Sequence, residues 1–428
     1  MEKILNPNRG DWKTLLERPT QSVEEIEETV TEIFKDVAQH GDFAISKYTS
    51  IFDGVEMDDY VVSNSEIAAA EHSVSKELKE AIKQARANIK SFHKAQQTDQ
   101  VRVETTNGVV CWQEKRPIER VGLYIPGGTA PLFSTVLMLA VPANIAGCKE
   151  IILCTPPNSK GEVAKEILYT AKLCGVTSIY KVGGIQAIAG LTFGTNTIPK
   201  VSKIFGPGNQ FVTVAKQLAT KFGIAIDMPA GPSELLVVAD DTANAAYVAS
   251  DLLSQAEHGT DSQVILVSTS EKLIAAVEKE IASQISVLPR KKIAKKAISK
   301  SKMILVDTKE TALALINEYG PEHFIICSEN ESFYVENVSN AGSVFIGNYT
   351  PESAGDYASG TNHTLPTNGF AKAYSGVNLD SFQKSMTFQK ISKEGLLNIG
   401  STIELMASAE GLQAHKNAVS IRLKDLKS

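Results

Sequence analysis

A regular alternation of short apolar segments with longer mixed segments constrains the fold more than any other feature of this chain. It begins near residue 121 and continues to about residue 347. Each interval between apolar segments is long enough for a helix that crosses back over a sheet, which is the connection that parallel strands need. The predicted strands are residues 121–125, 150–155, 178–182, 201–206, 234–239, 263–268, 302–307, 323–328 and 343–347. The sequence therefore predicts an α/β fold with doubly wound parallel sheets.

The Pro- and Gly-rich stretch DMPAGPSE divides the predicted strands into two sets. We therefore expect two α/β domains, one formed by residues 121–234 and the other built around residues 235–376. Residues 23–120 begin with apolar positions at helical spacing, and we assign them to the domain of residues 235–376. Residues 1–22 are expected to form an arm or a short helix. Residues 377–428 are predicted to be a helical tail, long enough to reach another domain or another subunit.

Charge and cysteine content indicate a reduced intracellular protein that binds neither nucleic acid nor a membrane. Lys and Arg number 43 against 49 Asp and Glu, a net charge of −6, which argues against polyanionic partners. The basic run at 289–302 predicts a solvated amphipathic helix. The five cysteines form no C-x-x-C pair, as in reduced proteins. No apolar run reaches the ~18 residues of a membrane span, and no signal peptide is evident, so we expect a cytoplasmic protein.

Glycines follow three of the predicted strands, in VGLYIPGGTAP (121–131), KVGGIQAIAG (181–190) and IFGPGNQFVTVAKQ (204–217). Glycines between a strand end and a helix start let backbone N–H groups approach an anion closely. None of the three is a complete G-x-G-x-x-G, so the usual dinucleotide fingerprint is absent. Any one of them could be an ordinary βα turn. Three at the same sheet edge favour a nucleotide or another extended ligand.

Glu322 and His323 are adjacent after a Gly-Pro turn in YGPEHFIIC. A carboxylate beside an imidazole offers two proton acceptors with different pKa values, which suits a reaction that removes two different protons. A hydrated loop remains the alternative interpretation.

Several other side chains could ligate a metal. Gln255 and His258 are three residues apart at the end of a predicted helix and share one face of it. The alternative is a polar helix end closed by Gly259 in the left-handed conformation. Asp356 lies with His363 in residues 351–376, a Gly-, Ser- and Thr-rich segment that we predict to be an ordered active-site loop.

The tail adds Glu410 and His415 in SAEGLQAHKNA. Together, Gln255, His258, Asp356 and His415, with Glu410 near the last, would suit Zn²⁺ or Mn²⁺. The residues are spread along the chain without a local motif, so spacing by itself does not decide for a metal.

With these segments in view, the sequence resembles the histidinol dehydrogenase family from end to end. The resemblance is carried by ERVGLYIPGGTAPLFSTVLMLAVPA, IFGPGNQFVTVAKQ, DMPAGPSE, LLSQAEHG, GPEH, ESAGDYASGTNHTLPT and EGLQAHKNAV. It implies the oxidation of L-histidinol to L-histidine in two NAD-dependent steps through an enzyme-held L-histidinal, the last steps of histidine biosynthesis. It also implies a homodimer with shared active sites and one zinc ion in each.

The resemblance further implies an architecture and a set of site residues. Two incomplete Rossmann-like domains are expected, with small helical elements at both termini and a tail that crosses to the partner subunit. The domain of residues 121–234 would carry the NAD contacts, and the other domain the zinc and the acid/base pair. Matched residue by residue, the zinc ligands are Gln255, His258, Asp356 and His415. The acid/base residues are Glu322 and His323, and the NAD contacts are Tyr124, Gln186 and Asn209. The substrate contacts are Ser233, His323 and Glu410, together with the four zinc ligands.

Three other functions remain as alternatives. A related zinc- and NAD-dependent dehydrogenase could act on another small polyol or a sulfonated diol. A two-lobed protein that only binds a small ligand would hold no zinc and turn over no NAD. A nucleic-acid-binding protein that used residues 289–302 would show strongly salt-dependent affinity.

Overall fold

The computed structural model describes residues 1–19, 23–57, 59–127 and 130–427. It divides into two compact units, and each is described by itself. The first unit comprises Met1–Gln96 and Ile118–Phe382, and the second comprises Gln97–Pro117 and Gln383–Ser428.

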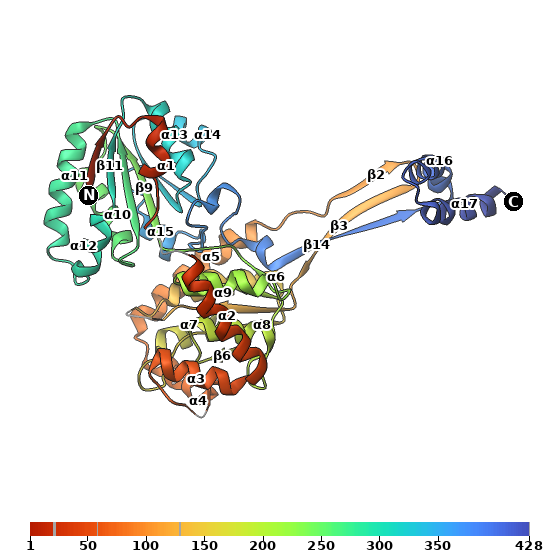
Figure 1. Cartoon of the computed structure of the whole chain (residues 1–428), viewed down its shortest axis with the longest axis horizontal. Helices are drawn as coiled ribbons and strands as arrows, with labels where there is room; N and C mark the ends of the chain where they lie inside the picture. Colours follow the sequence, from red (N-terminus) through yellow and green to blue (C-terminus); the bar gives the residue numbers. More distant parts are fainter. Residues whose placement is uncertain (20–22, 58, 128–129, 428) are drawn as a thin grey trace. The chain divides into compact units, whose positions relative to one another are not determined.

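The first unit contains a six-stranded parallel sheet in the order β1-β11-β10-β9-β12-β13. Its strands are β1 (Glu2–Leu5), β9 (Glu234–Ala239), β10 (Gln263–Ser268), β11 (Lys302–Leu305), β12 (His323–Cys327) and β13 (Ser343–Ile346). Alternate residues of the central strands face opposite layers, so that Leu235 and Val237 belong to one core and Leu236 and Val238 to the other. Figure 1 shows the sheet between two helical layers. One layer holds α10 (Ala245–Ala256), α11 (Glu271–Ile285) and α12 (Lys291–Ser299), and the other α1 (Trp12–Leu15), α13 (Lys309–Tyr319) and α14 (Glu331–Asn337).

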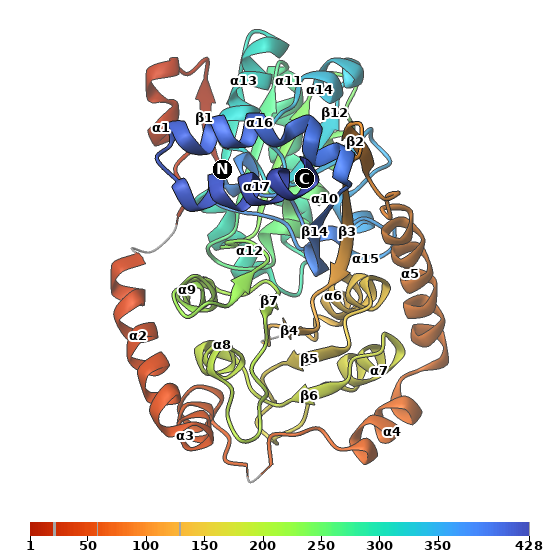
Figure 2. The same ribbon diagram turned by 90° about the vertical axis from the view of Figure 1, so that its right-hand side faces the viewer.

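The same unit contains a five-stranded parallel sheet in the order β6-β5-β4-β7-β8. Its strands are β4 (Arg120–Tyr124), β5 (Glu150–Cys154), β6 (Ser178–Tyr180), β7 (Lys203–Phe205) and β8 (Ala225–Ile226). Figure 2 shows helices on both faces of this sheet. One face is covered by α4 (Asn64–Ser73), α5 (Lys76–Ala95), α6 (Phe133–Ala146) and α7 (Lys165–Leu173). The other is covered by α2 (Val23–His40), α3 (Asp42–Asp53), α8 (Gly184–Phe193) and α9 (Gln210–Thr220).

The predicted fold class is confirmed, because both sheets are parallel and doubly wound and all nine predicted strands are present. The basic run also forms the predicted amphipathic helix, α12, which buries Ala294, Ala297 and Ile298. No helix in the described ranges is both long and apolar enough to cross a membrane.

The helices of residues 23–95 pack on the five-stranded sheet and not, as we expected, on the six-stranded sheet. Val30 and Phe34 of α2 share a core with α8 and α9, and Ile82 and Ile89 of α5 share one with α6. Their place is therefore with residues 120–226 rather than with residues 235–376. An apolar stripe predicts that a helix buries one face. It does not tell which of the two parallel sheets that face packs against.

The N-terminal arm is integrated into the six-stranded sheet. β1 pairs in parallel with β11, and Trp12 and Leu16 are buried beside α13. The arm's predicted last residues, 20–22, lie outside the described part of the chain. A strand at the edge of a sheet is formed by pairing with a distant segment, so its local sequence carries a weak signal.

The second unit is an antiparallel ribbon joined to a helical pair. β2 (Arg102–Thr106), β3 (Val109–Pro117) and β14 (Gln383–Ile391) pair in the order β14-β3-β2, and α16 (Lys393–Ala409) and α17 (Gln413–Lys427) follow (Figure 1). The prediction of a helical tail is therefore wrong for residues 383–391, which form a strand. Its pairing with β3, which includes a stacked Trp112–Phe388 ring pair at 5.3 Å between centroids, supplies what the local sequence does not show.

Candidate active site

Polar side chains gather at the amino edge of the six-stranded sheet. His323 is the first residue of β12, Glu322 precedes it, and Ser233 precedes β9. Gln255 stands in the last turn of α10. Residues 351–376 contribute a short helix, α15 (Glu352–Tyr357), and otherwise form a loop with the single 3-10 turn Phe370–Lys372.

Glu322 and His323 are held in one buried hydrogen-bonding network. The Oε2 atom of Glu322 accepts the backbone N–H of Glu234 at 2.8 Å and the Gln255 amide at 3.4 Å. Nδ1 of His323 lies 3.2 Å from both the Gln255 Nε2 and the Glu234 carbonyl oxygen. The Gly-Pro turn thus brings both side chains to the same place, and each is fixed in orientation.

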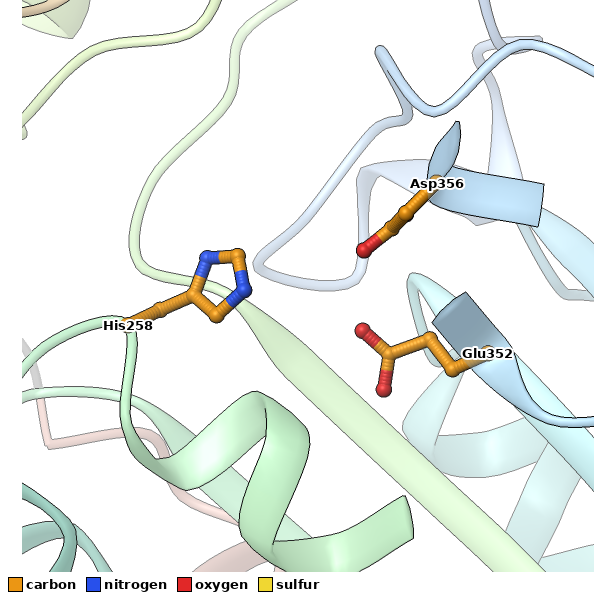
Figure 3. A group of neighbouring side chains, drawn as sticks. All are labelled: His258, Glu352 and Asp356. Carbon is orange, nitrogen blue, oxygen red and sulfur yellow. The ribbon is translucent and has the colours of Figure 1, made fainter. Parts of the chain in front are cut away.

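A second group of side chains converges beside this pair. His258, Glu352 and Asp356 each offer one ligand atom, and these atoms lie within 4.8 Å of one another. Figure 3 shows the imidazole of His258, from the turn after α10, pointing toward the two carboxylates of α15. Nε2 of His323 stands 3.6 Å from Oδ1 of Asp356, so the two groups are continuous.

The geometry that joins Gln255 to His258 differs from the predicted one. α10 ends at Ala256 with Glu257 as its C-cap, so His258 stands beyond the helix, and its N–H donates to the Gln255 carbonyl at 3.2 Å. Gly259 has no positive φ, so the left-handed cap of the alternative interpretation is wrong. A turn in which Glu257 remains in the right-handed region ends this helix without a glycine.

Glu352 is a member of the cluster that we did not predict. It is only 1% exposed, and its Oε2 accepts a hydrogen bond from Ser254 at 3.2 Å. The signal was the spacing of Glu352 and Asp356, four residues apart, which places two carboxylates on one helix face. Because residues 351–376 are predicted to be a loop, the sequence does not indicate that these two carboxylates share a helix face.

Burial and mutual proximity shift the pKa values of the cluster. Burial raises the pKa of Glu352 to about 8. Burial would lower the pKa of His323, but the carboxylates of Glu322, Glu352 and Asp356 raise it well above the ordinary value. Burial acts to raise the pKa of Asp356, and the neighbouring histidines lower it below its usual range. With its pKa at about 8, Glu352 is mostly protonated at neutral pH, so two carboxylates, Glu322 and Asp356, face the imidazole of His323 and an excess of negative charge remains.

Three buried atoms of the site have no hydrogen-bond partner among the described residues. They are Oε1 of Gln255, Nε2 of His323 and Oε1 of Glu352. Buried polar atoms are nearly always paired, so orphans that lie together indicate a missing ligand. Imidazole nitrogen with carboxylate and amide oxygens is a donor set suited to zinc, and a divalent cation would compensate the excess negative charge. The residues present therefore fit a metal ion.

Two predicted site residues belong to the second unit. Glu410 caps the C-terminus of α16, and His415 lies in the first turns of α17. Both are exposed. Ser233, in the first unit, is partly exposed, and its carbonyl accepts the N–H of Gln263 at 3.2 Å.

A cavity of about 710 Å³ lies at the carboxyl edge of the five-stranded sheet. Tyr124 and Asn209, two of the three residues expected to contact NAD, line it together with Gly127 and Gly184. The Tyr124 hydroxyl accepts the N–H of Gly184 at 3.1 Å, and Asn209 caps α9 through a bond from the Val212 N–H at 3.1 Å. The three glycine-bearing turns thus open into one cavity, as the sequence predicts for an extended ligand.

Gln186, the third expected NAD contact, does not line this cavity. It is fully buried in the first turn of α8, and its Nε2 donates to Oδ2 of Asp53 at 3.5 Å. Asp53 does line the cavity.

Comparison with known proteins identifies the family of this chain. The sequence profile of the histidinol dehydrogenase family matches residues 16–423. The chain is 56% identical to the histidinol dehydrogenase of Bacteroides thetaiotaomicron over 427 residues, which is 100% of both chains. It is 52% identical to that of Escherichia coli K12 over 418 residues, 97% of this chain and 95% of that one. The crystal structure of histidinol dehydrogenase from Elizabethkingia anophelis superposes with a TM-score of 0.97 at 56% identity, over 100% of this chain and 99% of that one. The chain therefore belongs to the histidinol dehydrogenase family and is an oxidoreductase.

Proposed function

We propose that this protein oxidises L-histidinol to L-histidine in two NAD-dependent steps at a zinc-containing site. The observation that carries the proposal is the cluster at the amino edge of the six-stranded sheet, whose members are buried or partly buried apart from the exposed His258. It joins an acid/base pair, Glu322 and His323, to a metal-binding group, His258, Glu352 and Asp356, within one network.

Gln255, His258 and Asp356 of the first unit would hold the zinc ion together with His415. Zinc, when bound, supplies a fixed Lewis acid that orients the substrate. NAD, when bound, accepts one hydride in each step. Such orientation can lower a barrier by several kcal/mol without further chemistry.

His323 is placed to take the hydroxyl proton of the alcohol. When its Nδ1–H donates to the Glu234 carbonyl, the neutral ring presents Nε2 as the acceptor. Nε2 is one of the unpartnered atoms of the site. A bound cation would offset the charge of the surrounding carboxylates. The imidazole of His323 could then be neutral and accept this proton.

Glu322 is placed to activate water for the second step, in which water adds to the aldehyde. In the described part of the chain, the contacts of its carboxylate are made through Oε2, which leaves Oε1 for a water molecule. Ser233 and Glu410 would complete the contacts to the substrate. Glu322 and His323 are buried, so an aldehyde held beside them would be kept from bulk water and would react before it escapes.

We also propose that the protein acts as a homodimer whose active sites are shared. His415 is exposed on the second unit, and His258 is exposed on the first, so both proposed ligands are open to another part of the assembly. A partner subunit would be that part.

The test is an assay of L-histidinol oxidation that measures both NADH and L-histidine. Two NADH per histidine are expected from the two hydride transfers, and treatment with a chelator should abolish both products until zinc is restored. A panel of small polyols and sulfonated diols serves as the comparison. Faster turnover of one of these than of histidinol would contradict the proposed substrate, and full activity after complete metal removal would contradict the zinc site.

A further inference from the structure

The N-terminal arm sends one charged side chain into the first unit. Arg18 follows α1, its side chain is only 14% exposed, and its Cζ lies 4.0 Å from the centroid of the Tyr319 ring. A charged group that is buried to this extent must be paired. The Arg18 Nε and Nη2 atoms donate to the two carboxylate oxygens of Glu234 at 2.6 and 2.9 Å, and Nη2 donates also to the Tyr319 carbonyl oxygen at 2.8 Å.

Both partners of Arg18 lead directly to the acid/base pair. Glu234 is the first residue of β9, its N–H donates to Oε2 of Glu322 at 2.8 Å, and its carbonyl oxygen lies 3.2 Å from Nδ1 of His323. Tyr319 ends α13, and the Gly-Pro turn that follows it carries Glu322. Arg18 therefore joins the strand that orients the pair to the turn on which the pair stands.

The carboxylate of Glu234 also holds the active-site loop. Its Oε1 accepts the N–H of Asn368 at 2.7 Å, and Asn368 has a φ of +55°, a left-handed conformation in which asparagine is one of the commoner residues. The Glu234 side chain is 4% exposed, and burial raises the pKa of its carboxyl, against the opposing effect of Arg18. The ion pair thus keeps a charged acceptor where the arm, β9 and the loop meet.

Neither charge of this ion pair has a part in the proposed chemistry. Among the described residues, the hydrogen bonds of the Arg18 and Glu234 side chains go to each other and to the backbone of Tyr319 and Asn368, and none goes to the metal-binding group. A buried ion pair costs desolvation and adds little net stability. Catalytic groups must be held within about 0.5 Å of their productive geometry, and the backbone contacts of this pair are suited to that purpose.

We propose that Arg18 is a positioning residue for Glu322 and His323. It clamps the start of β9 to the end of α13, so that the backbone of Glu234 meets both catalytic side chains at hydrogen-bonding distance. The planar guanidinium makes a paired contact with the carboxylate and reaches the Tyr319 carbonyl as well, which the point charge of a lysine cannot reproduce. This inference rests on the proposed function for the roles of the two catalytic residues.

Variants of the full-length, zinc-loaded protein separate positioning from stability. Arg18→Met leaves a buried carboxylate without its cation and should lower the urea midpoint, whereas Arg18→Met with Glu234→Gln removes both charges and should recover much of that loss. The kcat of the double variant for histidinol should nevertheless stay about 10²-fold below wild type, the cost of a misplaced catalytic group, with a much smaller change in KM. Arg18→Lys should give an intermediate kcat. Arg9→Met, which changes an exposed arginine of the same arm, should match the wild type.

Crystal structures of the wild type and of the double variant distinguish failure of the inference from failure of the function. In the double variant, Glu322 or His323 should be displaced by about 0.5 Å or more and lose its hydrogen bond to the backbone of residue 234. Catalytic side chains that stay in place, or a kcat that recovers together with the urea midpoint, would overturn the inference, because Arg18 would then only stabilise the fold. A wild-type protein that did not oxidise histidinol would refute the proposed function, and the displacement in the crystal would still decide the positioning role.

Discussion

At the scale of single residues, the proposed mechanism divides the two oxidation steps between Glu322 and His323 according to the atom that each leaves without a protein contact. Glu322 is anchored through Oε2, and His323 through Nδ1. An acid and a base that are neighbours in one network can serve different proton transfers when their surroundings fix different atoms.

We therefore expect different losses in two variants. Glu322→Gln should spare the oxidation of histidinol to the aldehyde and reduce aldehyde oxidation by about 10²-fold or more, the usual range for general-base catalysis. His323→Asn should impair the first step. Single-turnover measurement of each half-reaction checks this. Equal loss of both steps in both variants would refute the division.

Asp53 provides a second prediction at this scale, which concerns stability. Burial raises the pKa of its carboxyl from 3.8 to about 6, so between these pH values the folded state binds more protons than the unfolded state. Stability then falls as pH rises through this window. In the absence of dinucleotide, Asp53→Asn should raise the melting temperature relative to wild type at pH 8 and much less at pH 4. A pH-independent difference between the two proteins would show that ionisation of Asp53 is not the cause.

At the scale of elements, the turn after β7 is fixed by a buried ion pair. Nζ of Lys216, on α9, lies 2.5 Å from Oδ1 of Asp227 and donates to the Gly206 carbonyl at 2.7 Å. Oδ2 of Asp227 accepts the Gly206 N–H at 2.7 Å. Gly206 has a φ of +126°, a backbone conformation that residues with a Cβ atom rarely adopt. The pair thus fixes the turn that leads to Asn209, which lines the cavity beside the five-stranded sheet.

Removing one partner of this pair should be strongly destabilising. Lys216→Met leaves the Asp227 carboxylate buried without its cation, which costs about 3–5 kcal/mol of unfolding free energy. Lys216→Met with Asp227→Asn should recover part of that loss, because no uncompensated charge remains. Urea denaturation of the three proteins provides the measurement. A double variant no more stable than Lys216→Met would mean that the ion pair is not what stabilises this turn.

At the scale of the whole molecule, the chain places its proposed zinc ligands in two separate units. Gln255, His258 and Asp356 belong to the first unit and His415 to the second. If the second unit serves the partner's site, two different inactive variants can complement each other.

Mixing tests this arrangement. His323→Asn and His415→Asn should each be inactive alone. After joint unfolding and refolding, half of the dimers are mixed, and each mixed dimer holds one intact site, so about a quarter of wild-type activity should return. A mixture of His323→Asn with His258→Asn, both in the first unit, is the matched control and should show no such recovery, because no dimer then holds an intact site. If the His415→Asn mixture stayed inactive, His415 would act within its own chain.

Much of the fold was predictable from sequence, because buried parallel strands are continuous apolar runs whose signal is local. All nine such strands were identified, and so was α12. The strands β1, β2, β3, β8 and β14 were not identified, since each is short or at least partly exposed and depends on a partner strand elsewhere in the chain. The packing of α2 to α5 on the five-stranded sheet escaped prediction for a related reason. Their apolar stripes show that one face of each helix is buried but do not identify the sheet against which it packs.

For the site, the sequence by itself determined which chemical groups were available: the adjacent Glu322 and His323, the glycine-bearing turns, and the Gln255–His258 pair. Family resemblance connected these groups to a reaction. Only the tertiary structure decided that Glu352 joins His258 and Asp356, and that Asp53, held by buried Gln186, faces the cavity. The physical reason is that a side chain's chemistry is local, whereas its burial, its pKa and its partners depend on segments that are far apart in the chain and meet only when it folds.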